Sequence, residues 1–87
     1  MKYFVVAVRD RAADVFGVPQ FVASIGGAIR AFGDEVNRED LKNAFFMHPE
    51  DFDLYELGRY DDATGSFECL TVPKQVAIGK DMRIPRN

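Results

Sequence analysis

The sequence predicts a small α+β domain, built as an antiparallel sheet of about four strands with one main helix packed on one face and a C-terminal hairpin. Three features indicate this fold: an apolar segment at the start, a helical apolar stripe after Ser24, and a turn between two alternating segments. A chain of 87 residues that is 47% hydrophobic supports one core. We place the domain at residues 1–73 and expect residues 74–87 to form a basic, extended tail.

Residues 2–8 and 19–23 are predicted to form strands because of their Val and aromatic content. The first segment has two apolar faces, which is typical of a central strand or of a strand in a subunit interface. Pro19 confines the second segment to a strand start or a sheet edge. The charged residues 9–18 between them are expected to form a loop, part of which can be a short helical turn.

The clearest element is a helix over residues 24–37. Ser24 can cap it by accepting a hydrogen bond from one of the first free amides. Its apolar residues recur at helical spacing and form one stripe: Ile25, Ala28, Ile29, Phe32 and Val36. Three glycines weaken this helix by roughly 1 kcal/mol each relative to alanine. Packing against the sheet must therefore stabilise it.

The residues after this helix predict short helical turns and then a β-hairpin. One turn is expected around residues 41–45, and Pro49 followed by two acids is typical of a helix start. Residues 54–60 and 66–72 alternate as strands, and Gly65 in the turn between them suits a positive φ. Two rings are expected to pair across this turn: Tyr60 and Phe67.

The net charge of −3 is unevenly distributed along the chain. Residues 1–33 carry +2, residues 34–68 carry −8 and residues 69–87 carry +3, so an anionic ligand should meet the two ends. No apolar run approaches the roughly 20 residues that cross a bilayer, and the apolar start is too short for a signal peptide. The single cysteine, Cys69, excludes an internal disulfide and fits a reducing compartment. We therefore expect a cytoplasmic protein.

No pattern in the sequence indicates catalysis, a metal site or a cofactor. The acids near the hairpin are explained as first-turn helix acids or as residues on opposite strand faces: Glu50, Asp51, Asp53 and Glu56. His48, the only histidine, is expected to cap or pack, and Cys69 is typical of a buried thiol in a strand. The helix start at Ser24, with Arg30 a turn later, can bind phosphate. Close packing against the sheet explains its glycines better.

Aromatic residues alternate with cations in several places, as in proteins that stack rings on the bases of a single strand beside a basic groove. The alternative is that the rings fill the core, which we expect for Phe4, Phe32 and Phe52. The predicted nucleic-acid-binding residues are three tyrosines and eight cations: Tyr3, Arg9, Arg11, Arg30, Tyr55, Arg59, Tyr60, Lys74, Lys80, Arg83 and Arg86.

Two segments resemble a known family. They are the run 48–58 followed by 60–61 and 64–67, and the run 28–32 leading into 34–37. Together they resemble the small non-structural protein of gokushoviruses, which are Microviridae with circular single-stranded DNA genomes, over about residues 3–74. The resemblance implies a bacteriophage protein that acts in the infected host cytoplasm and binds single-stranded DNA or aids genome synthesis. It implies no catalytic residues.

Two functions stay open from the sequence. The first is non-enzymatic binding of single-stranded DNA during phage genome replication. The second is a protein-interaction module that recruits or modulates a host or phage replication protein, because the acidic middle segment suits a basic partner. Under either function a homodimer is expected, since exposed sheet edges and a doubly apolar first strand favour self-association.

Overall fold

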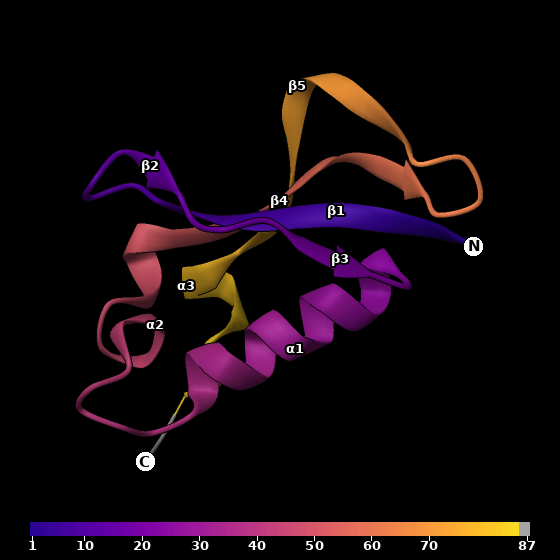
Figure 1. The fold of residues 1–87 in the computed structure, drawn as a ribbon. Helices are drawn as coiled ribbons and strands as arrows, with labels where there is room; N and C mark the ends of the chain where they lie inside the picture. The colour runs from indigo at the N-terminus through magenta and orange to yellow at the C-terminus, as the bar shows by residue number, and fades with distance from the viewer. Residues whose placement is uncertain (86–87) are drawn as a thin grey trace.

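In the computed structural model, which describes residues 1–85, the helices lie on one side of a curved antiparallel sheet (Figure 1). In chain order the elements are β1 (Lys2–Asp10), β2 (Val15–Phe16), β3 (Gln20–Val22), α1 (Ile25–Asn37), α2 (Ala44–Met47), the 3-10 turn η1 (Pro49–Asp51), β4 (Phe52–Asp61), β5 (Ser66–Ile78) and α3 (Gly79–Met82). The predicted α+β fold, with one main helix and a C-terminal hairpin, is confirmed.

β1 is the central strand of the sheet. The strand order is β2-β1-β4-β5, and β3 pairs with β1 along the edge that β2 also uses. The middle of β1 is buried on both faces, as its apolar residues predicted. The loop expected over residues 9–18 is shorter than predicted, because Arg9 and Asp10 remain in β1 and pair with β2.

α1 packs its apolar stripe against the sheet. Ser24 caps the helix as predicted, since its Oγ accepts a hydrogen bond from the backbone N of Gly27 at 3.0 Å. The buried core joins helix and strand residues: Val6, Ala28, Phe32, Val36, Phe52, Leu54 and Ala77. Burial of these side chains supplies the tertiary stabilisation that a glycine-containing helix needs.

Two short helical turns lead from α1 to the hairpin. The turn predicted around residues 41–45 begins at residue 44, and the helix start predicted at Pro49 is a single 3-10 turn. Asn43 is buried and fixes this connection. Its Oδ1 accepts from the backbone N of Phe45 at 3.1 Å, and its Nδ2 donates to the carbonyl oxygen of Glu35 at 2.8 Å.

β4 and β5 form the predicted hairpin, and both strands are longer than expected. Gly65 has a φ of +70° in the turn, as its position predicted. Tyr60 and Phe67 face each other across the turn with ring centroids 4.7 Å apart. The expected cross-strand ring pair is therefore confirmed.

Residues 70–73 of β5, which we name the β5 arch, leave the ladder. Gly58 of β4 pairs with Cys69 and Glu56 pairs with Lys74, so the arch has no partner in β4. Figure 1 shows β5 rising away from β4 at this point. The proline at the end of the arch is tolerated because no ladder hydrogen bond is required from it.

The segment after the arch is part of the fold, which corrects the domain boundary predicted at residue 73. The strand pairs with β4 again from Lys74, and α3 docks on α1. Asn37 of α1 holds this segment, because its Nδ2 donates to the carbonyl oxygen of Met82 at 2.9 Å. Its Oδ1 accepts from the backbone N of Ile84 at 2.8 Å.

Local features of the sequence explain why a tail was predicted after residue 73. Pro73 and the excess of cations after it are typical of an exposed linker. The strand resumes because Val76 and Ala77 pack on the core, and the apolar run 76–78 is too short to predict a strand. Of the predicted tail cations, Arg86 lies outside the described residues.

Asp53 connects the end of β1 to the start of α3. Its side chain is 1% exposed, its Oδ2 lies 3.2 Å from Nε of Arg11, and its Oδ1 accepts from the backbone N of Gly79 at 3.3 Å. Asp53→Ala leaves both donors without this acceptor, so we expect the free energy of unfolding to fall by about 2 kcal/mol. Urea unfolding measures the change. Asp34→Ala, at an exposed position of α1, is the control and should stay within about 0.5 kcal/mol; an equal effect of both substitutions would contradict the connection.

Candidate nucleic-acid interface

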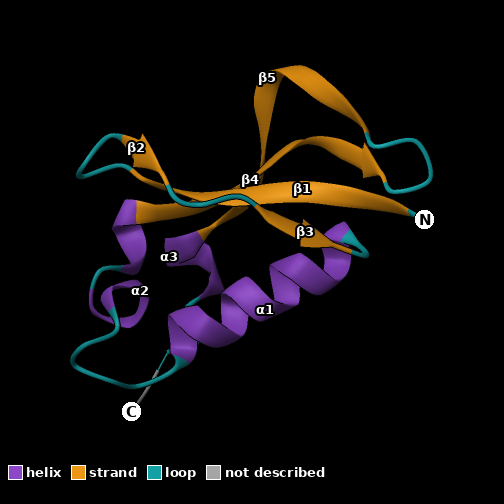
Figure 2. Cartoon of the chain, in the orientation of Figure 1, coloured by secondary structure: helices purple, strands orange, loops and turns teal. Residues whose placement is uncertain are grey.

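Figure 2 shows the helices on one side of the sheet. The opposite face of the sheet carries a set of aromatic rings. Val6 and Val8 of β1 belong to the core under α1. Because side chains alternate along a strand, Val5 and Ala7 point to the opposite face of the sheet. Directly paired residues of neighbouring strands point to the same face, so the partners of Val5 and Ala7 lie there too. The other residues of β1 on this face bring their own partners to it in the same way. We name this surface the aromatic face, and its six rings are Tyr3, Phe16, Phe21, Tyr55, Tyr60 and Phe67.

Five of the six rings of the aromatic face form two groups. Phe21 lies 5.4 Å from Tyr60 and 6.2 Å from Phe67, measured between ring centroids. Phe16 and Tyr55 form the second group at 5.3 Å. Phe16, Phe21 and Phe67 are 42%, 52% and 57% exposed. Their ring surfaces therefore remain accessible to a ligand.

A cavity of about 370 Å³ opens beside the first group of rings. Val5, Phe21, Leu57, Phe67 and Cys69 contribute to its wall. No histidine or carboxylate is among the described residues that line it. The cavity thus suits an apolar or aromatic ligand rather than acid–base chemistry. Cys69, for which a buried thiol was expected, is exposed.

The three tyrosines predicted from the sequence all lie on the aromatic face, so the structure brings them together. The sequence prediction missed the three phenylalanines. A signal for Phe67 was present, because its predicted pairing with Tyr60 already implied a shared face. Phe16 and Phe21 belong to very short strands, whose register the sequence does not specify.

Arg9 is the one predicted cation that the pairing places on the aromatic face within the described chain. Its guanidinium is ion-paired with Asp14 and lies 5.9 Å from the ring centroid of Phe16. The hydrogen bond to Asp14, and then that to Tyr55, raises the pKa of Arg9. The pairing with Asp14 lowers the positive charge that this face can offer to a phosphate.

The other predicted cations do not gather on the aromatic face. Arg11 pairs with Asp53, and Arg83 donates to the backbone carbonyls of Val36 and Phe46 beside the Phe46 ring. Four further cations are exposed, form no ion pair within the described chain, and lie in different places: Arg30 on α1, Arg59 over the ring of Phe4 and in the lining of the 370 Å³ cavity, Lys74 opposite Glu56, and Lys80 on α3. The predicted cations therefore do not form one basic groove within residues 1–85.

Many acids of the middle segment lie at the end of α1 and in the connection after it, on the helical side of the sheet. Arg38 lies between two of them and donates to both Glu35 and Asp40. This guanidinium holds the pKa of Glu35 below its usual range. A backbone N–H from Lys42, and then Arg38, lowers the pKa of Asp40. These acids thus stay ionised, on the side away from the aromatic face.

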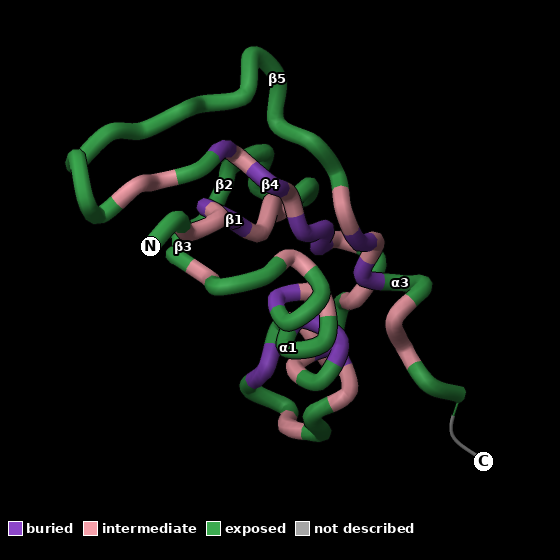
Figure 3. The backbone as a smooth tube through the Cα atoms, turned by 90° about the vertical axis from the view of Figure 1, so that its right-hand side faces the viewer, coloured by how far each residue is buried: buried purple, intermediate pink, exposed green. Residues whose placement is uncertain are grey.

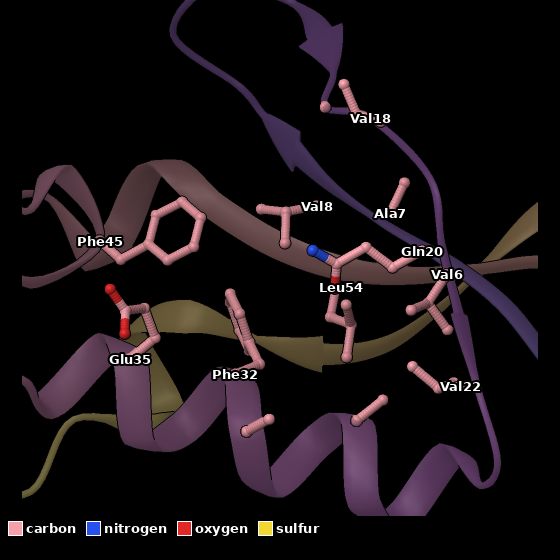
Figure 4. A pocket seen from close by; sticks show the side chains of 13 residues that line it. Val6, Ala7, Val8, Val18, Gln20, Val22, Phe32, Glu35, Phe45 and Leu54 are labelled. Carbon is pink, nitrogen blue, oxygen red and sulfur yellow. The ribbon is translucent and has the colours of Figure 1, made fainter.

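A second cavity, of about 410 Å³, lies between α1 and the edge formed by β1 and β3 (Figure 4). Figure 4 shows Phe32 and Phe45 on one side of it and Val6, Val8 and Leu54 on the other. Glu35 and Gln20 are its polar lining residues, and Glu35 is already paired with Arg38. The lining includes no set of groups that could act together as acid, base and nucleophile.

The turn at His48 and the start of α1 were both considered as sites from the sequence. The ligand atoms of His48, Glu50 and Asp51 lie within 4.8 Å of one another in one turn, where the first two residues are exposed. The His48 side chain forms no capping hydrogen bond, unlike the role expected for it. At the start of α1 the amide of Gly27 is taken by Ser24, which confirms the predicted cap. The close packing expected for the glycines there is wrong, because Gly26 and Gly27 are exposed and no atom lies within 4 Å of a Cβ added to Gly26.

Comparison with known proteins identifies the class of this chain as a phage protein. The model of the family described as Phage ORF5 protein matches residues 3–82. The chain therefore belongs to the Phage ORF5 protein family. Protein ORF5 of Chlamydia phage 1 is 35% identical over 71 residues, which cover 77% of this chain and 72% of that protein. No solved structure matches the chain significantly. The expected relationship to a microvirus-type phage protein is confirmed at this level.

None of the helices in residues 1–85 combines the length and the apolar character that a membrane-spanning helix requires.

Proposed function

We propose that this phage protein binds single-stranded DNA on the aromatic face, mainly by stacking, in the cytoplasm of the infected host during genome replication. The role is non-enzymatic. The observation that carries the proposal is the placement of six rings on one face of the sheet, three of them about half exposed. Membership of the Phage ORF5 protein family provides the biological setting.

Stacking is the contribution that this face can make. A base that stacks on an aromatic side chain gains roughly 1–3 kcal/mol, and the gain tolerates any base sequence. The two ring groups, Phe21 with Tyr60 and Phe67, and Phe16 with Tyr55, offer separate stacking positions. Two or three stacked bases contribute roughly 2–9 kcal/mol, and the upper end of this range corresponds to a micromolar dissociation constant.

The binding should depend only weakly on salt, because within residues 1–85 the cations beside these rings are Arg9, which is already paired, and Arg59, which lines the cavity. With one or two phosphate contacts, raising the salt from about 50 to 200 mM should weaken binding less than tenfold. Fluorescence anisotropy with a labelled oligo-dT measures this. An abasic strand of the same length keeps the phosphates, lacks the bases, and is expected not to bind. No binding of oligo-dT, or equal binding of both strands, would contradict the proposal.

A protein-interaction module is the second candidate function. The exposed apolar side chains of the β5 arch suit a protein partner. The ionised acids at the end of α1 and after it suit a basic partner. Pull-down from infected lysate, with and without nuclease, separates the two functions. A partner retained after nuclease treatment favours this second function, whereas loss of all partners favours DNA as the bridge.

A further inference from the structure

We propose that two copies of the chain pair antiparallel along the outer edge of β5 and join their sheets. β5 is the last strand of the sheet and pairs only with β4 in the described chain. Residues 66–75 are all exposed, as the course of β5 in Figure 3 shows. A free strand edge of this length is a template for another strand. This inference rests on the strand edge and does not depend on DNA binding.

Pro73, Lys74 and the irregular arch are features that can protect a free edge, but most exposed side chains of β5 are uncharged. Leu70 and Val72 of the arch are 39% and 71% exposed, and Phe67 is 57% exposed. The strand contains only two charged residues among thirteen, Glu68 and Lys74. Monomeric sheet proteins usually protect such edges with charges or by covering them. An uncovered apolar edge with so little charge favours a strand partner.

Charge complementarity selects the same strand of a second copy as that partner. An antiparallel pair centred on Thr71 places Glu68 opposite the partner's Lys74, and two-fold symmetry forms this contact twice. The same register places Leu70 opposite the partner's Val72, again twice. Each charged residue of the strand therefore faces an opposite charge, and each exposed aliphatic side chain of the arch faces another aliphatic side chain.

The backbone of the arch also gains from this pairing. Its four residues have no ladder partner in β4, so the second copy offers them the only strand neighbour. Pro73 falls two residues from the two-fold axis. In an antiparallel ladder, hydrogen-bonded and non-hydrogen-bonded pairs alternate. With a non-hydrogen-bonded pair at Thr71, Pro73 also falls in a non-hydrogen-bonded pair, where no backbone N–H is required of it.

Joining the two sheets would extend the aromatic face. A two-fold axis perpendicular to the sheet places the aromatic faces of both copies on the same side. The two sets of rings then form one longer surface. β1, which the sequence also offered as an interface strand, is not available, because β2, β3 and β4 occupy both of its edges.

Charge exchange across the interface is the first test. Light scattering and sedimentation should give a dimer for the full chain. Glu68→Lys and Lys74→Glu, each alone, place like charges together twice and should raise the dimer dissociation constant about tenfold. The double exchange should restore it. Arg59 and Glu56 face these residues within the chain, so circular dichroism and thermal melts verify that each variant is folded.

Two further variants, one with a matched control, locate the interface. Leu70→Glu combined with Val72→Glu should give a monomer, whereas Leu41→Glu, at an 82% exposed position before α2, should not change the mass. In a Cys69→Ser background, Thr71→Cys lies on the axis and should form a disulfide-linked dimer. The native Cys69 should not, because its two copies lie ~13 Å apart along the strands. A monomer at all concentrations, a dimer that the arch variants leave intact, or no rescue by the double exchange would overturn the proposal.

Discussion

Gly79→Ala is expected to lower the free energy of unfolding by about 3 kcal/mol. Gly79 is buried where β5 meets α3, and a Cβ at this position would collide with the carbonyl oxygens of Phe52 and Pro49. These atoms belong to the backbone and cannot rotate away, so α3 or β4 would have to shift. Loss of the hydrogen bond from the Gly79 amide to Asp53 would follow. Urea unfolding followed by circular dichroism measures the effect.

Gly26→Ala is the matched control, since the same substitution there should have the opposite sign. No atom lies within 4 Å of a Cβ added to Gly26. Alanine is better than glycine in a helix by up to about 1 kcal/mol, so this variant should be slightly more stable than the wild type. If Gly79→Ala were as harmless as Gly26→Ala, the C-terminal segment would not dock as described, and the basic tail predicted from the sequence would be supported instead.

The sequence predicted the parts of the fold that local signals determine. α1 follows from apolar spacing and the cap at Ser24, and the hairpin turn follows from Gly65 between two alternating segments. The continuation of β5 depends on a distant partner, because Ala77 pairs with Leu54. No pattern near residue 77 contains that information, whereas Pro73 locally suggests an end.

The convergence of the tyrosines depends on an irregularity that the sequence does not reveal. Tyr55 and Tyr60 are five residues apart, and strict alternation would place them on opposite faces of β4. The register shift between Glu56 and Gly58 adds one residue to β4 and returns Tyr60 to the face of Tyr55. The same shift orients Leu57 toward the cavity. The predicted grouping of the rings is therefore found for a reason that was not part of the prediction.

The cations failed to gather for a related reason. Their number and position along the chain are visible in the sequence, but their partners are chosen by tertiary structure. Arg9 and Arg11 flank the end of β1, where Asp14 and the buried Asp53 neutralise them. Arg83 is used to bind backbone carbonyls. Charge counting alone therefore overestimated the basic surface that is free to bind phosphate.

Phe21→Ala combined with Phe67→Ala is expected to weaken oligo-dT binding about 100-fold. The two rings flank the same cavity and are each more than half exposed, so they are the ones most able to contact bases. Removing two stacking positions, at roughly 1–3 kcal/mol each, accounts for a loss of this size. Fluorescence anisotropy at one fixed salt concentration measures it. The salt dependence should stay unchanged, because no cation is removed.

The conservative pair Phe21→Tyr and Phe67→Tyr is the control for this experiment, because it keeps both ring faces while adding a hydroxyl to each. Affinity within a few-fold of the wild type is expected for it, since stacking needs only an aromatic face. Phe21 and Phe67 also shield Val5 in the sheet, so thermal melts must show that the alanine variant is folded. A folded alanine variant that binds oligo-dT as tightly as the tyrosine variant would contradict stacking at the group of Phe21, Tyr60 and Phe67.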